Sequence, residues 1–189
     1  TSDGFTLTED GADIPMTGAQ ASILDRDAEA FVTLVLDNSP TMAGTGARND
    51  VVDGALGFVD KLFADGQGTT HVRVAFFSQS FEVTLGFSND QEAVKAAVEG
   101  LRSDTSGADP TNLYGAMIDA LDGSSAAQVA RDSAMRGGVR LIGQVVVFTA
   151  GADQAATSTL DQALDAIASS SDDVLSLGFG DGVEPDVLA

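Results

Sequence analysis

The strongest constraint on this chain is an unbroken apolar run that ends in an acid. In the stretch FVTLVLDNSPTM, residues 31–36 are all apolar except Thr33, which is β-branched. Such a run is typical of a strand that is covered on both faces, as in a parallel sheet. Asp37 follows at once, and Ser39 and Thr41 come at intervals of two. A buried strand therefore delivers an acid and two hydroxyls to its carboxyl end.

The rest of the chain shows strands that alternate with helices, as judged by hydrophobic period and turn signals. Further strands are predicted at 72–77, 81–85, 144–148 and 174–179. Helices are predicted at 47–64, at 88–101, from 111 onward, at 126–135 and at 159–168. Because most strands are followed by a helix, the pattern predicts a Rossmann-like α/β/α sandwich with a mainly parallel sheet. The hairpin at 72–85 adds one antiparallel edge strand.

A length of 189 residues favours a single folded domain. We expect residues 30–189 to form it. Residues 1–29 read as an N-terminal strand and connector, with a short strand at 5–8 that runs into a turn at Asp10 and Gly11.

Composition excludes several classes of function. Nine basic residues against 29 acidic ones give a formal charge of −20, which repels nucleic acids and anionic membrane surfaces. No apolar run is long enough to insert into a bilayer. The absence of cysteine excludes disulfides and thiol catalysis, and a Ser-His-Asp triad would depend on the single histidine, His71, which we expect at a strand end near a turn.

The acid and hydroxyls after the first buried strand are candidate metal ligands. In open α/β sheets, ligands bind outside the carboxyl ends of the strands. Asp37, Ser39 and Thr41 alternate along the loop there, so their side chains can converge, and Mg²⁺ and Ca²⁺ prefer such all-oxygen sets. The residues alone leave two alternatives open. One is a helix start capped by Ser39 or Thr41. The other is an aspartyl nucleophile, although both lysines, Lys61 and Lys95, fall on predicted helices.

Several motifs resemble the von Willebrand factor type A domain family. VLDNSPTM is similar to the Asp-x-Ser-x-Ser/Thr motif on which these domains build a metal-ion-dependent adhesion site. GADPTNLYGAM resembles the second motif, with Thr111 as its threonine, and VVVFTAGAD stands where the third motif follows a buried strand. LSLGFGDGVEPDVLA resembles the final strand and the start of the last helix, and the resemblance leads us to expect that this helix is truncated here.

The third motif departs from the family pattern. Type A domains normally have Thr-Asp-Gly there, and this sequence has Thr149, Ala150 and Gly151. An alanine side chain cannot bind metal, so the resemblance implies a variant site that lacks one carboxylate. Asp109 and Asp153 lie close in sequence and are candidate auxiliary acids.

The resemblance also implies how the ligands act. Ser39 and Thr41 would coordinate the cation directly, Asp37 would hold it through water, and Thr111 would join directly or through water. The ion would be Mg²⁺, or Ca²⁺ or Mn²⁺, bound weakly or not at all. The open position would take water or an acidic side chain of a protein partner.

From these features we expect a non-enzymatic protein-binding and adhesion module at a bacterial cell surface or in the periplasm, such as a surface lipoprotein or motility adhesin. One alternative is a type A domain with a degenerate metal site that binds through another surface. Another is a cytosolic adaptor for a ring ATPase. Hydrolase activity is disfavoured because the sequence shows no general base with a partner.

Overall fold

A computed structural model describes residues 8–9, 12–13, 28–40, 42, 46–65, 68–122 and 140–179. Its centre is a five-stranded sheet in the order β5-β4-β3-β6-β7. The strands are β3 (Ala28–Asp37), β4 (Gly68–Phe77), β5 (Phe81–Ser88), β6 (Arg140–Thr149) and β7 (Asp173–Gly178). All neighbours are parallel except the β4–β5 pair, so the predicted antiparallel edge strand is confirmed.

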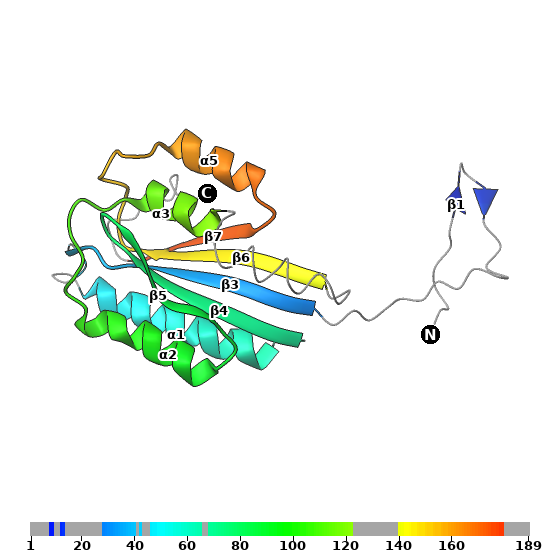
Figure 1. The fold of residues 1–189 in the computed structure, drawn as a ribbon, viewed down its shortest axis with the longest axis horizontal. Helices are drawn as coiled ribbons and strands as arrows, with labels where there is room; N and C mark the ends of the chain where they lie inside the picture. Colours follow the sequence, from blue (N-terminus) through cyan, green and yellow to red (C-terminus); the bar gives the residue numbers. More distant parts are fainter. Residues whose placement is uncertain are drawn as a thin grey trace.

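Helices cover both faces of the sheet, which gives three layers (Figure 1). On one face lie α1 (Ala47–Asp65) and α2 (Gln91–Gly100), and on the other lie α3 (Leu113–Leu121) and α5 (Leu160–Ser169). A short 3₁₀ helix, η2 (Leu101–Ser103), follows α2. The predicted α/β/α sandwich is therefore confirmed.

The central strand β3 explains why its sequence is so apolar. No residue from Phe31 to Leu36 is more than 5% exposed. Side chains alternate across a strand, so Leu34 and Leu36 join the core under α1 and α2, while Val35 joins the core under α3 and α5. Burial of both faces requires apolar side chains at every position, and this fixes β3 in the middle of the sheet.

Local signals set the ends of several elements. Asp90 caps α2 by accepting the backbone N–H groups of Glu92 and Ala93, and Thr159 caps α5 in a capping box with Gln162. Ser78–Ser80 forms the tight link between β4 and β5, with Ser78 N donating to Ser80 O at 3.0 Å.

Some predictions differ from the structure or lie outside its described part. Near the N-terminus, β1 (Thr8–Glu9) pairs antiparallel with β2 (Ala12–Asp13), and most of the predicted strand at 5–8 lies outside the described residues. The predicted helix at 126–135 also lies outside them. His71 is not at a strand end, because β4 begins at Gly68; its ring stacks on Phe31 at 4.8 Å between centroids. In the described ranges, no helix is both long and apolar enough to cross a bilayer.

Candidate functional site

Asp37 is the centre of the candidate site. It is the last residue of β3, and its side chain is 0% exposed. One carboxylate oxygen accepts the backbone N–H of Ser39 at 2.8 Å. The other accepts the Thr149 hydroxyl at 2.9 Å and the backbone N–H of Ala150 at 3.3 Å. The parallel register of β3 and β6 causes this contact, since Leu36 pairs with Phe148 and the next residues follow side by side.

The loop after Asp37 is held close to the sheet. Asn38 N donates to Phe77 O at 2.7 Å, and Ser39 O accepts from Met42 N at 3.1 Å. Ser39 is 1% exposed, whereas Pro40 is exposed. The third predicted ligand of this motif, Thr41, lies outside the described residues. The structure thus brings Asp37 and Ser39 together at one strand end.

Thr111 lies on a loop that is bonded to two others. Its carbonyl accepts from Gln154 N at 2.8 Å and Ala155 N at 3.0 Å, in the loop that follows β6. The next residue, Asn112, donates its backbone N–H to Ser78 O at 2.8 Å. Thr111 itself is 2% exposed. The backbone therefore anchors this buried hydroxyl among the same loops that surround Asp37.

Gly107 places the same loop against the first motif. A Cβ built at this glycine would lie 1.8 Å from Asn38 O and 2.9 Å from Asn38 C. Any side chain at position 107 would therefore push the loop away from Asn38.

The two candidate auxiliary acids have different surroundings. Asp153 accepts the backbone N–H groups of Tyr114 and Ala156, each at 3.2 Å, so it braces the start of α3 and its own turn. Asp109 is exposed. Neither forms a hydrogen bond with Asp37 in the described part of the chain. At position 150, the methyl group of alanine packs against the apolar core.

The chemistry of these donors fits a hard cation. Asp37, Ser39, Thr111 and Thr149 are all oxygen donors, and none is more than 2% exposed. Within the described ranges, no Lys, Arg or His forms an ion pair with Asp37. No group of three or more Asp, Glu, His or Cys side chains gathers there either. The arrangement therefore suits one divalent ion with few charged ligands, which implies weak binding.

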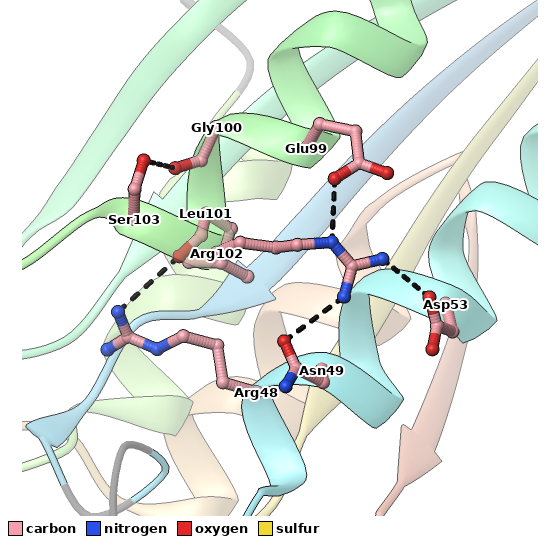
Figure 2. Close-up of polar contacts among 8 residues, drawn as sticks. All are labelled: Arg48, Asn49, Asp53, Glu99, Gly100, Leu101, Arg102 and Ser103. Atoms are coloured by element: carbon pink, nitrogen blue, oxygen red, sulfur yellow. Dashed lines mark hydrogen bonds and ion pairs between the residues drawn. The ribbon is translucent and has the colours of Figure 1, made fainter.

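Two arginines fasten the start of α1 to the segment that leads to Thr111 (Figure 2). Arg102 donates to Glu99 Oε2 at 2.6 Å, to Asp53 Oδ1 at 2.5 Å and to Asn49 Oδ1 at 3.1 Å. Its bond to Glu99 is the largest cause of its raised pKa, followed by its bond to Asp53.

Arg48, near the start of α1, also bonds to the segment around η2. Its Nη1 donates to the carbonyls of Leu101 and Asp104. The role of both arginines was not predicted from the sequence, because their spacing does not indicate that α1 and η2 are neighbours.

Asp104, whose carbonyl accepts from Arg48, also has a carboxyl group with a shifted pKa. Its Oδ1 accepts Ser106 N at 2.7 Å, and hydrogen bonding to Ser106 is the main reason that its pKa is lowered. An acid whose pKa is lower in the folded state adds stability above its unfolded value of about 3.9, and loses that contribution as pH falls through the folded value.

We expect Asp104→Asn to lower the free energy of unfolding by about 0.5–1 kcal/mol at pH 7, because this partly exposed carboxylate is screened by solvent. The difference from wild type should begin to shrink as pH falls below about 4 and should vanish once pH is below the lowered pKa of folded Asp104. Urea unfolding across pH measures this. Asp165→Asn, on the exposed side of α5, should show no such pH-dependent difference.

Comparison with known proteins identifies the family. The profile of the von Willebrand factor type A domain matches residues 32–189. The chain belongs to this family. The resemblance seen in the sequence motifs is thereby confirmed for family and fold. The search of curated proteins found no match to this type A domain.

Solved structures show the same fold at low identity. An aerotolerance-related membrane protein from Bacteroides fragilis is 22% identical, with a TM-score of 0.55, and the match covers 80% of this chain and 68% of that one. Proximal thread matrix protein 1 from the mussel byssus, with a zinc-occupied adhesion motif, is 17% identical, with a TM-score of 0.64 and coverage of 86% and 41%. Manganese-loaded Plasmodium vivax TRAP protein is 15% identical, with a TM-score of 0.63 and coverage of 84% and 60%. This type A domain thus spans less than two thirds of the last two proteins.

Proposed function

We propose that this type A domain binds protein partners through a divalent cation held beside Asp37. Type A domains are generally interaction modules rather than enzymes. The observation that carries the proposal is the fully buried Asp37 carboxylate, fixed at a strand end by Ser39, Thr149 and Ala150 without a basic partner in the described part of the chain. A buried charge needs a compensating partner, and a cation supplies one.

Each residue has a role in the proposal. Ser39 and Thr41 coordinate the ion directly, Asp37 holds it through water, and Thr111 joins directly or through water. The bonds to Thr149 and Ala150 leave Asp37 little freedom to turn, which suits an outer position in which a carboxylate orients bound water. Asp109 and Asp153 are auxiliary acids: each adds negative charge near the ion, and neither is required as a ligand.

The alanine at position 150 shapes what the ion does. One carboxylate fewer near the cation weakens its hold on the protein. It also leaves more positive charge on the ion, so a partner's Asp or Glu is attracted more strongly to the open position. We propose Mg²⁺ as the ion, with Mn²⁺ and Ca²⁺ as substitutes, and an acidic side chain as the recognised group.

Two of the similar structures support the proposal by analogy. The adhesion motif of the mussel protein is occupied by zinc, and the Plasmodium protein is manganese-loaded. The bacterial relative is described as a membrane protein, which supports a role at a bacterial cell surface or in the periplasm. A formal charge of −20 raises the local concentration of cations and disfavours nucleic acid as a partner.

Water-proton relaxation with Mn²⁺ tests the recognition step without knowledge of the partner. Acetate should displace water from the protein-bound ion and lower the relaxation rate, whereas acetamide at the same concentration should not. Ser39→Ala should lose the bound-ion signal, and Ser171→Ala, in the exposed loop before β7, should keep it. An equal response to acetate and acetamide would refute carboxylate recognition and favour binding through another surface.

A further inference from the structure

A small polar cavity opens beside the candidate site. It has a volume of about 60 Å³ and is lined by Asn38, Phe76, Phe77, Ser78, Ser80, Glu82 and Ser106. Neither Asp37 nor Ser39 lines it, because successive side chains leave an extended backbone in opposite directions. The cavity is therefore separate from the site at Asp37, although it shares the same loop.

Asn38, one of the residues that line the cavity, has a buried side-chain oxygen without a hydrogen-bond partner. Asn38 is 3% exposed, and its Oδ1 makes no hydrogen bond. Its Nδ2 donates to Ser106 Oγ at 3.4 Å, and hydrogen bonding from Asn38 also helps to lower the pKa of Asp104. Turning the amide over would aim its carbonyl oxygen at that carboxylate, so Oδ1 must stay on the other side of the group. A carbonyl in this position needs a donor or a cation.

The remaining lining is also rich in oxygen. Ser78, Ser80 and Ser106 bring hydroxyls, and Glu82, near the start of β5, brings the single carboxylate among the described lining residues. The Ser78 hydroxyl accepts Ala108 N at 3.1 Å and retains a free lone pair. Amide, hydroxyl and carboxylate oxygens from three separate segments are the donors that Ca²⁺ accepts with few demands on geometry, whereas Mg²⁺ requires near-ideal octahedral geometry.

We propose that this cavity is a second cation site, which takes Ca²⁺ through Asn38 Oδ1 and Glu82, with serine hydroxyls and water completing the shell. The cavity is larger than the roughly 10–15 Å³ that one water needs, so an ion with some of its water fits. With one carboxylate, the dissociation constant should lie at about 10⁻⁴–10⁻³ M. Bound calcium would join the β4–β5 link to Ser106, on the loop that continues to Thr111.

The test separates this site from the one at Asp37. Ser39→Ala weakens the first site, so calcium binding can be followed in this background. Calorimetric titration of this chelator-stripped variant with Ca²⁺ should show saturable binding, and Mg²⁺ should bind more weakly. Adding Glu82→Gln should weaken the calcium affinity at least about tenfold, because it removes the one carboxylate among the described lining residues. Glu92→Gln changes another exposed acid, on α2, and is the matched control that should leave the affinity unchanged.

Equal calcium heats for the Glu82 and Glu92 variants would overturn the proposal and would mean that the cavity holds water only. Thermal unfolding of the two single variants, without Ser39→Ala, provides a second test. Calcium should raise the midpoint less in Glu82→Gln than in Glu92→Gln, and identical shifts would contradict the proposal. Because binding at Asp37 depends on Ser39 and binding here depends on Glu82, either site can fail while the other stands.

Discussion

Replacing Gly107 by alanine is expected to lower the free energy of unfolding by about 2–3 kcal/mol, near the upper end for a group forced into a packed site. The new Cβ would lie 1.8 Å from Asn38 O. A flexible side chain could turn away from such a contact, but this obstacle is the backbone of the first motif. The loop that carries Thr111 must therefore move, and divalent-ion binding should weaken together with stability.

Gly57→Ala is the matched control for this prediction. Gly57 is exposed within α1, and a Cβ there meets nothing within 4 Å. Alanine in a helix is favoured over glycine by about 0.5–1 kcal/mol, so this variant should be more stable than wild type. Urea unfolding of both variants checks the pair. A Gly107 variant as stable as wild type would contradict the close contact between the two loops.

Asp37→Asn is expected to weaken divalent-ion binding at least about 100-fold, because it removes the only carboxylate among the buried donors. Stability should also fall by about 1–3 kcal/mol. The native carboxylate accepts from Ser39 N on one side and from the Thr149 hydroxyl and Ala150 N on the other. An amide nitrogen must face one of these donors, whichever way it turns.

Asp165→Asn makes the same chemical change on the exposed side of α5. It should alter neither ion affinity nor stability beyond a few tenths of a kcal/mol, as is usual for surface positions. Ion titration and urea unfolding of both variants give the comparison. An Asp37 variant with wild-type stability would show that the three hydrogen bonds contribute little.

Much of this architecture could be predicted because its signals are local. The apolar run ending at Asp37 indicates a central strand, and the link at Ser78–Ser80 indicates a hairpin. Both features depend only on neighbouring residues, so burial on two faces and turn chemistry were enough to predict them.

The supports of the site depend on contacts between distant segments. Gly107 matters because of Asn38, and Arg48 because of Leu101 and Asp104. The sequence shows that position 107 is a glycine in a loop, but it does not show which carbonyl that glycine approaches. In the same way, only the packed structure shows that Asn38 Oδ1 is buried without a partner.

Calorimetric titration of the chelator-stripped protein with Mg²⁺, Mn²⁺ and Ca²⁺, beside Asp37→Asn, tests the central claim most directly. The account predicts saturable binding of Mg²⁺ and Mn²⁺ at one site in the wild-type chain, and its loss in the variant. Identical Mg²⁺ and Mn²⁺ heats in the two proteins would contradict a metal site at Asp37, whereas calcium heat that remains in the variant belongs to the separate cavity at Asn38 and Glu82.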